Sequence, residues 1–185
     1  MSERILPRRG FLQASAAALA VSNINAEAAQ PAVRAGEPTR FQIACMTLPY
    51  SPFSLQRALT GIRDAGFRHV AWGTTHRENG KQIPVLAADA APAQARDLAQ
   101  RCRDLGLEPV MMFSGVYPEA RNGLEVLQQR LRQAAAARIP QVLTFGHTRG
   151  GNAALWLERF RQLAPLCRDS NVLLVVKQHG GEIEL

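Results

Sequence analysis

Three of the four histidines follow short apolar runs, where a buried strand would end: His76, His147 and His179. Neutral imidazoles bind divalent metals and also form hydrogen bonds with sugar hydroxyl groups. The fourth, His69, precedes its apolar run, so we expect it at the opposite end of that strand, in a structural role. Any one of the three alone would more often be an ordinary loop histidine, but three equivalent positions predict a site.

Other side chains occupy the same predicted strand ends. Lys177 would supply a positive charge or hold an anionic substrate, and the alternative is a solvated lysine. Trp72 would either stack on a sugar ring or be buried in its strand. Three further residues follow strands and would line a pocket: Tyr50, Tyr117 and Arg149. Three glycines either let the backbone approach a ligand closely or simply make a turn: Gly146, Gly150 and Gly151.

The elements that must position these residues form a repeating strand–helix pattern, because the chain from Phe41 onward alternates between two hydrophobic periods. We predict strands over 41–48, 69–76, 108–116, 141–146 and 172–177, and helices over 54–66, 93–106, 123–138 and 152–170. The strands are mostly continuous apolar runs, which is typical of a parallel sheet covered by helices. The longest loop is predicted over 77–92, and we expect it to fold over the site.

The ends of the predicted helices carry a second repeat. Asp64-Ala65-Gly66-Phe67 matches Asp104-Leu105-Gly106-Leu107 at a distance of 40 residues, and Asn171 takes the glycine's place after the last helix. Glycine and asparagine tolerate the left-handed conformation that ends many helices. Ser54 is a candidate cap for the first helix. The repeat is therefore that of a βα unit.

The fold class that follows is α/β. A doubly wound nucleotide-binding fold would place a glycine-rich turn after the first strand, but the turn here is "TLPYSPFS". A (β/α)8 barrel accepts almost any loop there and brings its strand ends to one mouth. We therefore predict a partial TIM barrel of about five parallel strands with four intervening helices. Since a full barrel needs about 250 residues, we expect 41–185 to be its N-terminal part, in a C-terminally truncated chain.

The first residues are typical of an export signal. Arg8 and Arg9 are followed by Phe11 and Leu12 and by an alanine-rich run, and Ala26-Glu27-Ala28 offers a cleavage site. We interpret 1–28 as a twin-arginine signal and 29–40 as a linker, with a periplasmic or secreted destination. The apolar run is too short to span a bilayer, so no stable membrane insertion is expected. An ordinary amphipathic helix is the alternative.

The formal net charge of +7 raises the question of an anionic partner. Its arginines are spread singly over the predicted helix faces, with no basic run carrying interleaved aromatic residues, so no nucleic-acid partner is predicted. The three cysteines are far apart and are expected to be small core residues: Cys45, Cys102 and Cys167.

These motifs resemble the xylose isomerase-like barrels, which are sugar phosphate isomerases and epimerases with the apurinic endonuclease IV proteins as relatives. The resemblance covers roughly 41–181 and rests on "ALTGIRDAGF" leading into "HVAWGTTH", on "LGLEPVMMFSG", on "VLTFG" and above all on "LLVVKQHGG". It implies proton transfer next to the carbonyl of a sugar or sugar-like substrate at the barrel mouth. The implied catalytic residues are Lys177 and His179, and the implied substrate contacts are His76, His147, Trp72 and Arg149.

The resemblance also implies a divalent metal, Mn, Mg or Zn, in full-length relatives, with His179 as a candidate ligand. In such enzymes a glutamate at the end of strand five is a ligand, but this chain has Lys177, which offers hydrogen-bond donors only. A non-catalytic carbohydrate-binding barrel is therefore the alternative function. Endonuclease-like DNA repair ranks lowest, because it conflicts with export and with the dispersed arginines. Exposed sheet edges in a partial barrel would favour self-association.

Overall fold

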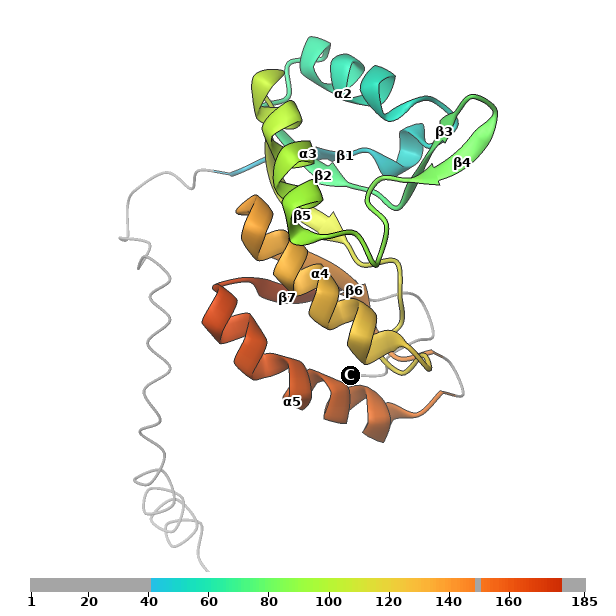
Figure 1. Cartoon of the computed structure of the whole chain (residues 1–185), viewed down its shortest axis with the longest axis vertical. Helices are drawn as coiled ribbons and strands as arrows, with labels where there is room; N and C mark the ends of the chain where they lie inside the picture. The colour runs from blue at the N-terminus through green and yellow to red at the C-terminus, as the bar shows by residue number, and fades with distance from the viewer. Residues whose placement is uncertain (1–40, 149–150, 178–185) are drawn as a thin grey trace, which may run out of the picture. The chain divides into compact units, whose positions relative to one another are not determined.

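The computed structural model describes residues 41–148 and 151–177 (Figure 1). These residues belong to one compact unit, Phe41–Leu185. The predicted signal and linker, together with Arg149 and His179, lie outside the described residues. Within the described part of the chain, no helix is long and apolar enough to cross a membrane.

Five parallel strands form one sheet in the order β1-β2-β5-β6-β7. Their bounds are β1 Ala44–Met46, β2 His69–Trp72, β5 Glu108–Phe113, β6 Gln141–Phe145 and β7 Leu173–Lys177. Each βα unit is placed next to the one before it, and the predicted parallel sheet of five strands is confirmed. The first strand is shorter than predicted, since the 3-10 helix η1 (Leu48–Tyr50) begins immediately after it.

Four α-helices follow the strands: α2 Leu55–Asp64, α3 Pro92–Asp104, α4 Gly123–Ala137 and α5 Ala153–Ser170. Neighbouring helices α3, α4 and α5 pack side by side, against β5, β6 and β7 respectively (Figure 1). The core lies between the helices and the sheet and is built from aliphatic residues and one tryptophan: Leu59, Val70, Trp72, Leu98, Met112, Leu127, Leu131, Val142 and Leu163. Cys102 belongs to this core, as predicted, while Cys45 and Cys167 are half-buried and pack against it.

The predicted helix ends are confirmed. Gly66 and Gly106 have φ values of 88° and 79°, and Asn171 has a φ of 52°. The Gly66 and Gly106 amides each donate to the last turn of the preceding helix, at 2.8 Å in both cases. Ser54 caps α2, because its hydroxyl oxygen accepts a hydrogen bond from the Arg57 amide at 3.2 Å.

The segment after β2 differs from the prediction. Residues 77–92 were expected to form a loop, but an antiparallel hairpin lies there, with strands β3 (Thr75–Glu78) and β4 (Lys81–Pro84). Its turn is Asn79-Gly80, both with positive φ (49° and 80°), as a two-residue hairpin of the type I′ kind requires. His76 consequently belongs to β3 and not to the end of the second sheet strand.

The two faces of the sheet are distinguished by its register. Val70 and Trp72 of β2 and Val142 of β6 point toward the helix layer and belong to its core. The alternate positions face the other way, because successive strand residues point to opposite faces. Phe145 and Lys177 are register partners on that second face.

Candidate active site at the carboxyl edge of the sheet

The loops after β5 and β6 meet at the carboxyl edge of the sheet, and a glutamate joins them. Glu119 Oε1 accepts hydrogen bonds from both the Thr148 amide, at 2.7 Å, and the Thr148 hydroxyl. Its second oxygen, Oε2, is buried and has no partner among the described residues. A Cβ on Gly151 would collide with the Glu119 carboxylate. Glycine at this position therefore allows close packing of the two loops, a role that differs from both of those predicted for it.

The loop after β5 is fixed by buried hydroxyl groups. Thr144 is fully buried, and its hydroxyl donates to the Val116 carbonyl at 3.1 Å. The Ser114 hydroxyl donates to the same carbonyl at 3.3 Å. At the far end of the loop, the Gly123 amide donates to the Ala120 carbonyl at 2.8 Å. The backbone that carries Glu119 is thus held at both ends.

Aromatic rings stack at the carboxyl ends of β5 and β6. The Tyr117 ring is stacked on Phe145, with centroids 4.3 Å apart and an interplanar angle of 17°. Phe113, at the end of β5, packs against Phe145 at 5.1 Å. The Trp156 indole N–H donates to the Phe145 carbonyl at 3.1 Å. An apolar surface with a few converging polar groups is typical of small-molecule sites.

His147 follows β6 by two residues and is half-buried. Its Nδ1 lies 3.0 Å from the Thr148 carbonyl oxygen. A carbonyl only accepts, so Nδ1 carries the proton and the neutral ring presents Nε2 as an acceptor. Since Glu119 holds Thr148 by two hydrogen bonds, the carboxylate also positions the group that orients this imidazole.

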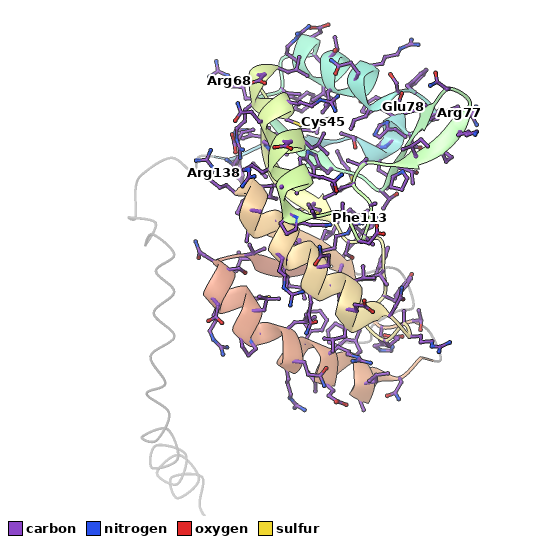
Figure 2. The ribbon with its side chains drawn as sticks, in the orientation of Figure 1. Cys45, Arg68, Arg77, Glu78, Phe113 and Arg138 are labelled. Carbon is purple, nitrogen blue, oxygen red and sulfur yellow. The ribbon has the colours of Figure 1, made fainter. Side chains whose placement is uncertain are left out.

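Lys177 ends β7 in the strand register next to Phe145. Its carbonyl accepts from the Gly146 amide at 3.3 Å, immediately before His147. The side chain is exposed. A cation and an oriented imidazole therefore lie at the same edge of the sheet. Figure 2 labels Phe113 at this edge and places Arg68 and Arg138, which precede β2 and β6, at the opposite one.

The Trp72 side chain lies on the helix-covered face of the sheet and not on its open face. Its ring is 1% exposed and is part of the helix-covered core. Of its two predicted roles, Trp72 therefore has that of a residue buried in its strand. A sugar could stack on the indole ring only by displacing core side chains.

His76 is also separated from His147 in the structure. Its ring is 1% exposed, and Nδ1 lies 3.0 Å from the Phe53 carbonyl oxygen. It lines a cavity between α2, the hairpin and α3. No contact joins His76 to His147 among the described residues, and His179 lies outside them, so the convergence of the three histidines stays a prediction. His69 lies beside Glu108 at the amino edge of the sheet, where it was predicted.

The described residues do not fit a divalent metal site. Among them, no group of three or more His, Cys, Asp or Glu side chains converges closely enough to hold a metal ion. At the carboxyl edge Glu119 and His147 have suitable ligand atoms, but the neighbouring cation of Lys177 does not.

No protein-family model matches the sequence, and no curated protein matches it. Solved structures do match. A sugar phosphate isomerase/epimerase from Parabacteroides distasonis is 10% identical with a TM-score of 0.51, over 77% of this chain and 53% of its own. The probable 3-DHS dehydratase AsbF of petrobactin synthesis from Bacillus anthracis is 16% identical with a TM-score of 0.51, over 74% and 52%. A xylose isomerase domain protein from Planctomyces limnophilus is 10% identical with a TM-score of 0.50, over 74% and 52%.

These likenesses show the fold. The described residues have the fold of part of a TIM barrel, with five of its parallel strands and four of its helices. The chain spans about half the length of these solved structures. In such barrels the carboxyl ends of the strands carry the active site, which is the edge where Glu119, His147 and Lys177 lie.

Glu119 was missed by the sequence analysis. It lies in the middle of a loop, in "YPEARNG", where no hydrophobic period marks it. The signal that could have found it is a lone carboxylate in the loop that follows a predicted barrel strand.

Proposed function

We propose that the chain is the catalytic half of a sugar or sugar phosphate isomerase or epimerase, which moves a proton at the carbon next to a carbonyl. The observation that carries this proposal is the oriented imidazole of His147 beside the Lys177 strand end. A proton carrier and a cation at one barrel edge are the two groups that such a reaction requires.

In the proposed mechanism, His147 Nε2 removes the proton from the carbon beside the carbonyl. The electron pair of that C–H bond forms the carbon–carbon double bond of an enediolate, and the carbonyl oxygen takes the negative charge. In an isomerisation, the hydroxyl proton on the carbon that lost its hydrogen moves to the former carbonyl oxygen, and His147 then gives its proton to the former carbonyl carbon as the new carbonyl forms on its neighbour. In an epimerisation, a second acid gives its own proton to the opposite face of the original carbon, the carbonyl re-forms, and His147 afterwards loses its proton to solvent. The hydrogen bond from Nδ1 to the Thr148 carbonyl is kept throughout.

Lys177 compensates the negative charge that develops on the enediolate oxygen. Its ammonium is a hydrogen-bond donor and a point charge, and it also suits the phosphate of a sugar phosphate. The ring surface of Tyr117 and Phe145 supports the apolar face of the sugar. Glu119 acts through Thr148 and is a positioning residue in this mechanism.

The test is hydrogen exchange into substrate. The full chain is incubated in D2O with a panel of aldoses, ketoses and their phosphates, and deuterium at the carbon next to the carbonyl is measured by NMR. We expect catalysed exchange with at least one of them. His147→Gln should lower the rate about 100-fold or more, since general acid–base catalysis contributes about 10²–10⁴.

The matched control is His69→Gln, because His69 lies at the amino edge of the same sheet. It should leave the exchange rate unchanged. Exchange that survives in His147→Gln, or no exchange with any of the sugars, would exclude the proposed mechanism. Binding without exchange would identify the carbohydrate-binding alternative, which the aromatic stack favours, and Tyr117→Ala should then weaken that binding.

A further inference from the structure

A second candidate site lies on the helix side of the barrel. A cavity of about 830 Å³ opens between the start of α2, the β3–β4 hairpin and α3. Ligand pockets in proteins typically have about 300–1,000 Å³. None of its lining residues belongs to the loops after β5 and β6, so it is separate from the carboxyl-edge site.

The floor of this cavity contains a buried acceptor. His76 is 1% exposed, and its Nδ1–H donates to the Phe53 carbonyl at 3.0 Å. The second ring nitrogen, Nε2, is buried and has no partner among the described residues. In the neutral ring Nε2 is a lone-pair acceptor. His76 lines the cavity and Phe53 does not, and Nε2 lies on the side of the ring away from the hydrogen bond to Phe53.

The charge of the lining is negative. Three carboxylates, Glu78, Asp89 and Asp97, face one guanidinium, Arg101, which is a formal excess of two negative charges. Glu78 lies two residues after His76 on β3, so both side chains point to the same side of the hairpin. One Glu78 oxygen accepts from the Leu55 amide at 2.9 Å, which holds the carboxylate against the start of α2. Figure 2 labels Glu78 and its neighbour Arg77 on the hairpin.

Most of the remaining lining is apolar and includes Leu55, Leu86 and Leu98, and two glutamines, Gln56 and Gln94, also line the cavity. The carboxylates are too dispersed for a metal ion, since no set of three His, Cys, Asp or Glu side chains converges in the described chain. Negatively charged hydrogen-bond acceptors that are spread around a mostly apolar wall fit a larger organic cation, which has N–H donors and a hydrocarbon body. We propose that this cavity binds a small amphipathic organic cation, with its ammonium group between His76 and the carboxylates and its hydrocarbon body against the leucines.

The probe is n-hexylammonium, and its neutral match is 1-hexanol. Isothermal titration of the full chain at low salt should show saturable binding of one hexylammonium per chain, at least tenfold tighter than the alcohol. Asp97→Asn should weaken binding about two- to fivefold, as expected for one exposed charge pair. The control is Asp104→Asn, also on α3 but outside the cavity, and it should leave the affinity unchanged.

His76→Asn tests the buried acceptor. The asparagine amide can still donate to the Phe53 carbonyl, but it lacks a counterpart of Nε2. Binding should fall about tenfold or more, because hydrogen bonds to charged groups are the stronger ones. Circular dichroism checks that the variant is folded, and the double variant Asp89→Asn, Asp97→Asn carries the test if it is not. Equal affinity for hexanol, an equal loss in Asp104→Asn, or the absence of saturable binding would each overturn the proposal.

Discussion

At the scale of single residues, close backbone contacts decide where the catalytic groups lie. Glu119 reaches Thr148 because Gly151 leaves room beside the contact, and Gly123 lets the loop that carries Glu119 pack closely against the start of α4. A Cβ on Gly123 would collide with the Tyr117 and Pro118 carbonyls, both in the loop that carries Glu119. These two glycines, which have no side chains, therefore influence where the Glu119 side chain lies.

We predict opposite effects for two helix glycines. Gly123→Ala should destabilise the protein by about 1–3 kcal/mol, since the methyl group must displace backbone atoms. Gly61→Ala should stabilise it by about 0.4–1 kcal/mol, because Gly61 is exposed inside α2 and nothing lies within 4 Å of its added Cβ. Urea unfolding of both variants measures the difference. Equal changes in the free energy of unfolding for the two variants would mean that the loop after β5 accommodates the methyl group added at position 123 without a cost in stability.

The sequence predicts the site residues unevenly. Lys177 and His147 could be placed because they directly follow apolar strands, and strand ends of a parallel sheet share one edge. The face on which Trp72 lies could not be predicted, since a strand buried on both sides is apolar throughout and carries no alternation. The contact between Glu119 and Thr148 joins two loops 29 residues apart, and no local pattern encodes it.

At the scale of elements, the helix ends and the parallel strands follow from local signals, while the hairpin was missed. Its signal was present: Asn79-Gly80 is a favoured pair for a two-residue turn. The flanking strands carry mostly polar and charged side chains, and β4 is exposed throughout. Because its strands have no apolar alternation, the segment resembles a loop in the sequence. The hairpin is stabilised by the tertiary packing of His76 and Glu78 against the start of α2.

The start of β5 is tied to two helix ends by one arginine. Arg103, near the end of α3, donates to both Glu108 oxygens, at 2.7 to 3.1 Å, and to the Ala137 carbonyl near the end of α4 at 3.0 Å. The hydrogen bonds from Arg103 lower the pKa of the Glu108 carboxyl below its ordinary value. The same bonds raise the pKa of Arg103.

A pH dependence follows from this ion pair. A carboxyl whose pKa is lower in the folded state stabilises it above the unfolded pKa, and the contribution is lost as pH falls through the folded pKa. Glu108→Gln should therefore cost stability at pH 7, by about 1 kcal/mol at most because the Glu108 carboxylate is 47% exposed to screening solvent. The cost should shrink as the pH falls below the ordinary glutamate pKa of about 4.3, and it should vanish at a low pH beneath the lowered pKa of the folded state.

Urea unfolding at both pH values measures this difference. Asp64→Asn is the control, because Asp64 pairs with its neighbour Arg63 at an exposed helix end, and its effect should stay within about 0.5 kcal/mol. A loss in Glu108→Gln that persists undiminished at low pH would assign the role of Glu108 to packing instead of charge.

At the scale of the whole molecule, the sheet has two free edges among the described strands, β1 and β7. Large apolar side chains are exposed at both: Phe41 and Ile43 just before β1, at 82% and 68%, and Leu173 in β7, at 61%. Edge strands with exposed apolar residues recruit further strands. In the solved neighbours, about half of the chain lies beyond the matched part.

We therefore propose that the 185-residue chain self-associates through the β7 edge. Leu173→Lys should shift it toward the monomer in sedimentation velocity, because a charged edge residue opposes strand addition. Leu157→Lys is the matched control, since Leu157 is 44% exposed on α5, away from any strand edge. A monodisperse wild-type monomer, or an equal response of both variants, would contradict association through this edge.

The order of the strands also affects how the sheet forms during synthesis of the chain. Each strand of the sheet pairs with the sheet strand before it in the chain, so every pairing closes a loop of modest length. As the N-terminal part of a chain leaves the ribosome first, β1 and β2 can meet before β7 has been synthesised. Each later strand then joins an existing edge and becomes the new one. The sheet grows in one direction, and at every stage of synthesis its newest strand is a free edge opposite the free edge of β1.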